Sequence, residues 1–93
     1  MPMELERSIE ISNRYGLHAR ASTRLAQVAK QFQSSIRVSR GRSDEGVDAK
    51  SILGILTLGA EKGQCLHIRA SGDDAEQAMA ALIQLIEQNF GEE

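Results

Sequence analysis

The feature that most constrains the fold is an alternation of apolar and polar residues in four segments of the chain. These segments cover residues 4–12, 36–40, 47–49 and 64–71. An alternating strand turns its apolar side chains to one face of a sheet and its polar side chains to the other. The sequence therefore predicts an antiparallel sheet with one face against a core and the other face in water.

Two longer segments repeat apolar residues every three or four positions, which is typical of amphipathic helices. The first begins near Leu17 and is expected to end near Phe32 or Gln33. The second follows Gly72 and carries its buried stripe as far as Phe90, where Gly91 is expected to stop it. Helices of this kind bury one side only, so both are expected to pack on the apolar face of the sheet.

Signals for helix starts complete the predicted order. Asp73 with Glu76, and Asp74 with Gln77, are possible capping boxes for the last helix. A shorter apolar segment at 50–58 is a third helix candidate. The order strand, helix, strand, strand, helix, strand, helix predicts an α+β fold. In it, three helices cover one face of a four-stranded antiparallel sheet.

Two expectations concern the surface of this fold. His67 shares the polar side of its strand with Cys65 and Arg69, so it is expected to face solvent. The two terminal residues, Glu92 and Glu93, follow the helix-stopping glycine and are expected to fray.

Length and composition exclude several classes of protein. The 93 residues correspond to one domain, 1–93, and the formal net charge of −2 with only three aromatic residues argues against nucleic-acid binding. No apolar run reaches membrane-spanning length, and the first residues lack the shape of a signal peptide. One cysteine suits a reducing cytoplasm, and Cys65 with two histidines is too sparse for a metal site.

The candidate chemistry is concentrated at the start of the first helix. His18 stands there, after Gly16 and two positions before Arg20. The first N–H groups of a helix have no partner within it and attract anions. A phosphoryl group on the ring of His18 could therefore meet backbone donors and the guanidinium of Arg20. A lone histidine at this place is more often an ordinary surface residue, so the neighbouring residues decide.

Those neighbours have a known counterpart. The segment Gly16-Leu17-His18-Ala19-Arg20 resembles the active-site signature of HPr, the histidine phosphocarrier of the phosphoenolpyruvate-dependent phosphotransferase system. The segment Asp48-Ala49-Lys50-Ser51-Ile52-Leu53-Gly54 resembles the regulatory-serine segment of the same family, and the likeness extends from Glu4 to Phe90. HPr-like proteins form the open-faced β-sandwich that the alternation predicts. The family usually has proline after the arginine, where this chain has Ala21, which adds one backbone N–H.

The resemblance implies a function for these residues. His18 would accept a phosphoryl group on Nδ1 from enzyme I and pass it to a histidine of an enzyme IIA domain, without a cofactor or metal on the carrier. Arg20 and the backbone N–H groups of Ala19, Arg20 and Ala21 would stabilise the phosphoryl oxygens. The carrier is expected to be a cytoplasmic monomer, in either the sugar-uptake or the nitrogen-related regulatory branch. The alternatives are a non-transferring regulatory module of the same fold and a small hydrolase with His18 as base.

Further residues are expected to meet partner proteins. Ser51 is either a helix cap or a phosphoacceptor for a serine kinase and its phosphatase. The apolar residues after it exceed what one side of a short helix can bury, so part of the set is expected at the surface as a docking patch. The docking residues expected there and along the polar side of the first helix are Ile52, Leu53, Leu56, Arg24 and Lys30. The two cations could equally be ordinary solvated charges.

Overall fold

The computed structural model of the chain describes residues 3–92. Its elements are β1 (Met3–Glu10), α1 (Ala19–Ala29), β2 (Ser35–Ser39), β3 (Val47–Asp48), α2 (Ile52–Leu58), β4 (Cys65–Gly72), α3 (Ala75–Glu87) and the 3-10 turn η1 (Asn89–Gly91). The strands form one sheet in the order β1-β4-β2-β3, and every neighbouring pair is antiparallel. The predicted order of elements is confirmed, with strand ends that differ from the predicted ones by one or two residues.

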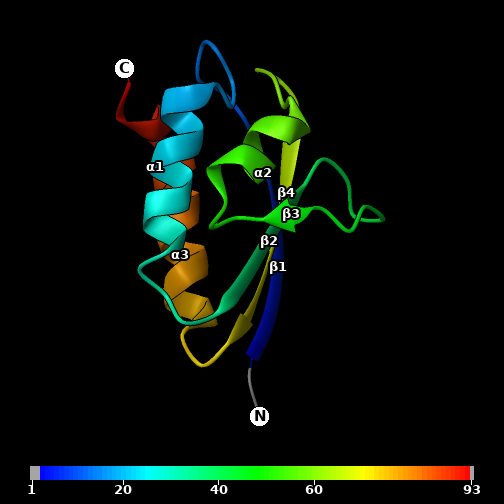
Figure 1. Cartoon of the computed structure of the whole chain (residues 1–93), viewed down its shortest axis with the longest axis vertical. Coiled ribbons are helices and arrows are strands. Elements are labelled where there is room, and N and C mark those ends of the chain that lie inside the picture. Colours follow the sequence, from blue (N-terminus) through cyan, green and yellow to red (C-terminus); the bar gives the residue numbers. More distant parts are fainter. Residues whose placement is uncertain (1–2, 93) are drawn as a thin grey trace.

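The helices lie on one side of the sheet. Figure 1 shows α1 and α3 side by side along the sheet, and α2 beside the upper half of α1. The core between these layers is made of apolar side chains that are almost fully buried. Its largest members are Phe90, Ile11, Leu25, Ile36, Ile55, Leu66, Ile68, Leu82, Ile86 and Val38. The predicted α+β architecture, a four-stranded antiparallel sheet covered on one face by three helices, is therefore confirmed.

Helix α1 ends at Ala29, before the predicted end at Phe32 or Gln33. The amides of Gln31 and Phe32 donate to carbonyls three residues back, which tightens the last turn and ends the helix. Beyond it, the backbone N–H groups of Gln33 and Ser34 donate to the carboxylate of Asp74, at 2.8 and 2.9 Å. The chain is thus drawn away from the helix axis towards the start of α3.

This use of Asp74 corrects the predicted capping boxes. Asp74 is the N-cap residue of α3, but its side chain makes no capping bond to that helix. Hydrogen bonds from the Ser34 hydroxyl and from the Gln33 and Ser34 amides hold the pKa of Asp74 below its ordinary value. The carboxylate therefore joins the end of α1 to the start of α3, a contact between residues 40 positions apart.

Helix α3 also ends earlier than its apolar stripe suggests, at Glu87. Asn89 and Phe90 both have positive φ angles, 55° and 58°, which are uncommon for residues other than glycine. This turn sends the side chain of Phe90 into the core, where it is 1% exposed, although Phe90 is outside the helix. Figure 1 shows the result: the red C-terminal segment lies beside the pale-blue start of α1.

The sheet face away from the helices is only partly open to water. The connection between β2 and β3 projects on that side (Figure 1), and the carbonyl of Glu45 accepts hydrogen bonds from Arg37 and Arg69. His67 is only 4% exposed, so the prediction that it faces solvent is wrong. Its ring is held between Ser8 and Glu6 of the neighbouring strand, at 2.9 and 2.8 Å.

Candidate functional site

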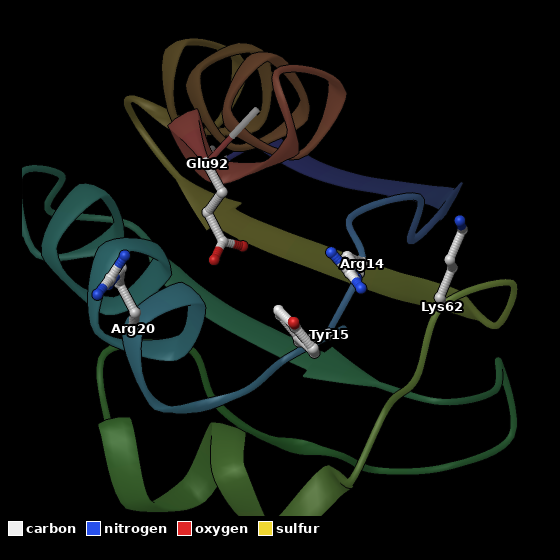
Figure 2. Close-up of a pocket in the computed structure, with 5 residues that line it drawn as sticks. All are labelled: Arg14, Tyr15, Arg20, Lys62 and Glu92. Carbon is white, nitrogen blue, oxygen red and sulfur yellow. The ribbon is translucent and has the colours of Figure 1, made fainter.

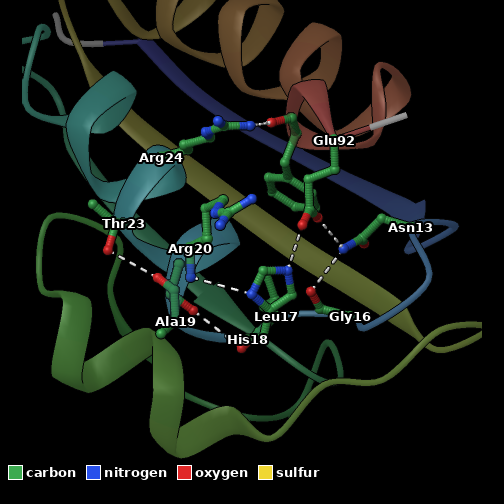
Figure 3. A network of polar contacts seen from close by, with 11 residues as sticks. Asn13, Gly16, Leu17, His18, Ala19, Arg20, Thr23, Arg24 and Glu92 are labelled. Atoms are coloured by element: carbon green, nitrogen blue, oxygen red, sulfur yellow. Dashed lines mark hydrogen bonds and ion pairs between the residues drawn. The ribbon is translucent and has the colours of Figure 1, made fainter.

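His18 is the N-cap residue of α1, and its ring is fixed by two hydrogen bonds. Its Nδ1 accepts from the backbone N–H of Arg20 at 3.2 Å, and its Nε2 lies 2.6 Å from Oε2 of Glu92 (Figure 3). A nitrogen that accepts a hydrogen bond carries a lone pair rather than a proton. The ring proton is therefore on Nε2, where it is donated to Glu92. With 28% of its side chain exposed, His18 is accessible to a reactant.

The second carboxylate oxygen of Glu92 accepts from Nδ2 of Asn13 at 2.9 Å. Burial raises the pKa of Glu92, but hydrogen bonds from His18 and Asn13, together with the charge of Arg20, outweigh it and leave the pKa below its ordinary value. The segment is anchored further where Arg24 donates to the Phe90 carbonyl and Ser12 donates to Asn89. The prediction that Glu92 frays is thus wrong, and Glu93 lies outside the described residues.

The loop before His18 requires glycine at position 16. Gly16 has a φ of 63°, and a Cβ at this position would lie 2.5 Å from the Ala60 carbonyl oxygen. Its own carbonyl accepts from Nδ2 of the fully buried Asn13, at 2.8 Å. The N–H of Leu17 then bonds to Ala60, and its side chain enters the core. The loop is therefore held on both sides as it delivers His18 to the start of the helix.

Basic residues surround this corner of the molecule. A pocket of about 520 Å³ is lined by Arg14, Tyr15, Arg20, Lys62 and Glu92. Figure 2 shows the Glu92 carboxylate pointing into it, between Arg20 on one side and Arg14 on the other. Tyr15 meets the His18 ring edge to face at 5.9 Å between centroids, and the Arg14 guanidinium lies 5.3 Å from the centre of the Tyr15 ring. Three cationic side chains in one pocket favour an anionic reactant.

The predicted phosphate-binding amides belong to the first turn of α1. The N–H of Arg20 is directed at the His18 ring, and Ala19 and Arg20 are both exposed. Ala21 stands at the position where the family usually has proline, and its side chain is fully buried in the core. The alanine thus fits the packing of α1, while its effect on the binding of an anion remains a prediction.

The apolar residues of α2, which include three of the residues predicted to dock partners, are divided between surface and interior. Leu53 is 76% exposed and Ile55 is fully buried, whereas Ile52 and Leu56 are half-buried, so part of the apolar set does stay at the surface. Ser51 caps α2, because its Oγ accepts from the Gly54 N–H at 3.0 Å.

The two predicted docking cations have different surroundings. Arg24 is half-buried and donates to the carbonyl of Phe90, which gives it a structural role in holding the C-terminal segment. Lys30 is exposed at the C-cap of α1. Their part in docking stays a prediction.

Five residues of this site were not among the predicted ones: Asn13, Arg14, Tyr15, Lys62 and Glu92. Glu92 lies 74 positions from His18, and no periodic pattern connects them. Within residues 3–92 the structure contains no cluster of three or more potential metal ligands. The same part of the chain contains no helix long and apolar enough to cross a membrane.

Comparison with known proteins agrees with this geometry. Residues 5–88 match the family model described as "PTS HPr component phosphorylation site". The phosphocarrier protein HPr of Neisseria meningitidis serogroup B is 46% identical over 88 residues, which cover 95% of this chain and 97% of that protein. The phosphocarrier protein NPr of Shewanella violacea is 37% identical over 89 residues, 96% of each chain.

A solved structure gives the same result. The crystal structure of HPr-C-His from Thermoanaerobacter tengcongensis matches with a TM-score of 0.87 and 46% identity, over 96% of this chain and 98% of that one. Both the sequence and the fold are therefore shared along nearly the full length of these relatives. The chain belongs to the HPr family of phosphocarriers of the phosphotransferase system.

Proposed function

We propose that His18 is the phosphoacceptor of this carrier, and that it takes a phosphoryl group from enzyme I and passes it to a histidine of an enzyme IIA domain. The observation that carries the proposal is the hydrogen bonding of its ring. Nδ1 faces the backbone N–H of Arg20 and Nε2 faces the Glu92 carboxylate, which implies a lone pair on Nδ1 and the ring proton on Nε2. A neutral imidazole nitrogen with its lone pair available is the nucleophile that phosphoryl transfer needs.

The surroundings of Nδ1 suit a transferred phosphoryl group. The backbone N–H of Arg20, which donates to Nδ1 in the unphosphorylated ring, can donate to a phosphoryl oxygen once the new P–N bond has formed. The helix terminus favours negative charge at Nδ1. The cations Arg14, Arg20 and Lys62 of the neighbouring pocket, which Glu92 also lines, favour an approaching anion. These groups are at the surface, where each contributes modestly, so the phosphorylated ring is stabilised without being trapped. That balance suits a carrier that must release its phosphoryl group.

Docking of both partners is proposed to use the surface of α2. A leucine that is 76% exposed on a short helix is the kind of apolar group that partner proteins cover. The carrier is also proposed to work as a monomer.

Ser51 is proposed as a second, regulatory phosphorylation site next to this surface, modified by a serine kinase and restored by a phosphatase. Its hydroxyl already accepts the Gly54 N–H, so a phosphate there would replace the cap and add about −1.5 to −2 charges. The charge would stand beside Ile52 and Leu53, where an incoming partner would have to desolvate it. Slower transfer from enzyme I would follow, through weaker docking rather than through a change at His18.

The test is to incubate the chain with enzyme I and labelled phosphoenolpyruvate, and then with several enzyme IIA domains. The chain is expected to gain acid-labile label and to pass it to at least one acceptor, in the cytoplasmic sugar-uptake branch or the nitrogen-related branch. Comparing acceptors of the two branches assigns the chain to one of them. A chain that remains unlabelled would instead be a regulatory module that binds partners without transferring phosphate.

A further inference from the structure

The C-terminal segment supplies a group at the phosphorylation site that its distance along the chain does not suggest. We propose that Glu92 is a positioning residue for phosphoryl transfer: its carboxylate holds the His18 proton on Nε2 and so keeps Nδ1 as the nucleophile. The inference rests on the proposed role of His18 as phosphoacceptor. It assigns a function to a residue that approaches the ring from the far end of the chain.

The geometry is that of a strong, directed hydrogen bond. The 2.6 Å between Nε2 and Oε2 is short for an N–H···O contact, as expected when the acceptor is a carboxylate. The Glu92 side chain is only 13% exposed, so water competes little for it. Its other oxygen is fixed by Asn13, which also bonds to the loop at Gly16. The carboxylate therefore has a defined direction relative to the ring (Figure 3).

The segment that carries Glu92 is held in a costly conformation. Asn89 and Phe90 both have positive φ angles, a left-handed backbone that is uncommon for residues other than glycine and is strained above all for the bulky Phe90. Three contacts oppose this cost: the buried ring of Phe90, the bond from Arg24 to the Phe90 carbonyl, and the bond from Ser12 to Asn89. Strain of this kind persists where the surroundings determine the conformation, and here its effect is to place a carboxylate on the His18 ring.

The position of the His18 ring proton matters both when the phosphoryl group is accepted and when it is passed on. On acceptance, the Nδ1 lone pair bonds to phosphorus while the donor P–N bond breaks and its electron pair returns to the donor nitrogen. The proton stays on Nε2, so the phosphorylated ring carries a positive charge beside the Glu92 carboxylate. On transfer, the P–Nδ1 bond breaks, its electron pair returns to Nδ1, and phosphorus bonds to the acceptor nitrogen. No proton has to leave the ring in either step, and Glu92 offsets the transient ring charge.

Two variants separate the two parts of this role, the hydrogen-bond acceptor at Nε2 and its negative charge. Glu92→Ala removes the acceptor at Nε2 but leaves the Arg20 N–H at Nδ1, so the share of the Nδ1–H form is expected to rise above that of the wild type. Transfer from phosphorylated enzyme I should be about tenfold slower. Glu92→Gln keeps a neutral acceptor but loses the charge, so the Nε2–H form should persist while transfer slows by about threefold. The matched controls are Glu87→Ala and Glu87→Gln, which change an exposed glutamate of α3.

The readouts are single-turnover transfer kinetics and nitrogen-15 NMR of labelled histidine. The His18 signals are identified by their absence in His18→Ala. A Glu92→Ala chain that keeps the Nε2–H ring and transfers within twofold of Glu87→Ala would overturn the proposal. Slow transfer by Glu92→Ala with an unchanged ring would overturn it too, because the Glu92 carboxylate would then not be what holds the proton on Nε2. Failure of the wild type to accept phosphate is a separate outcome: it refutes the role of His18, while the NMR result still reports on Glu92.

Discussion

The two histidines of this chain are bonded alike and placed differently. Each has a carboxylate at Nε2: Glu92 at 2.6 Å for His18, and Glu6 at 2.8 Å for His67. Each also has a hydrogen-bond partner at Nδ1, the Arg20 amide for His18 and the Ser8 hydroxyl for His67. A histidine bonded to a carboxylate is therefore not by itself the mark of a reactive site.

The difference lies in what surrounds Nδ1. The His18 side chain is 28% exposed at the start of α1, beside a pocket with three cationic side chains. The His67 ring is 4% exposed on the middle of the sheet, where the neighbouring strand covers it. An incoming phosphoryl group needs a path to the nitrogen and donors for its oxygens, and only the first ring has both. The comparison teaches that access and electrostatics, rather than the His–Glu pair, separate a candidate carrier site from a structural cluster.

The largest expected effect comes from removing each ring in turn. His18→Ala should abolish acceptance of acid-labile phosphate, because no other described nitrogen has the same access and donors, and its circular dichroism should match the wild type. His67→Ala should accept phosphate within twofold of the wild type but lose about 1–3 kcal/mol of unfolding free energy, because its buried hydrogen bonds disappear. Labelling by enzyme I and urea denaturation measure the two effects. Acceptance by His18→Ala would break the comparison.

A smaller effect is expected from the cation next to each histidine–carboxylate pair. Arg20→Gln removes a positive charge at the phosphoryl position and should slow transfer by about tenfold. Arg42→Gln is its matched control, since the charge of Arg42 contributes to the lowered pKa of Glu6 in the other cluster, and its transfer should be unchanged. Single-turnover transfer from phosphorylated enzyme I measures both. Equal rates for the two variants would show that the positive charge at Arg20 is not what distinguishes His18.

The fold and the position of the candidate phosphoacceptor at a helix start could be predicted from sequence, because both leave short-range signals. Alternation in the strands and stripes in the two long helices fix the layers, and Gly16 to Arg20 is a continuous motif. The early end of α1 left no such signal, since it depends on Asp74 reaching back 40 positions to Ser34. Local propensity therefore placed the helices correctly and their ends less well.

The remainder of the site depends on contacts that no local pattern encodes. From the sequence, Glu92 is predicted to be a frayed terminal residue. In the structure, a strained turn at Asn89 and Phe90 brings it to His18. His67 occupies a polar position of an alternating strand, and only the side chains of the neighbouring strand show that it is covered. In both cases the decisive partner is more than 50 residues away in sequence, which is why single-sequence reasoning missed it.

The third effect concerns the apolar surface of α2, the helix that packs beside α1. Leu53→Glu should raise the apparent KM for the carrier in transfer from enzyme I by about fivefold, because a buried charge opposes docking. Its stability should change by less than about 0.5 kcal/mol, since the side chain is 76% exposed. Steady-state transfer and thermal unfolding measure the two quantities. Normal transfer would place the docking surface elsewhere, and a large loss of stability would make Leu53 a core residue.

The smallest effect is expected from the carboxylate of Glu6, in the cluster that it forms with Ser8 and His67. The hydrogen bond from His67 holds the pKa of Glu6 below its ordinary value of 4.5, assisted by the charges of His67, Arg42 and Arg69. A carboxyl group with a lowered pKa in the folded state stabilises the fold above its ordinary pKa, and this contribution is lost as the pH falls through the folded value.

Glu6→Gln should therefore have a lower urea midpoint than the wild type at neutral pH, and the difference should shrink as the pH falls below the ordinary value of 4.5 and the wild-type carboxylate is protonated. Glutamine can still accept from the His67 ring, so the shape of the cluster is retained and only its charge is lost. Transfer at neutral pH should be unchanged, whereas Glu92→Gln should slow it. If the two glutamine variants slowed transfer equally, the charge at either histidine would act on the whole domain, and the distinction between His18 and His67 would have to rest on access alone.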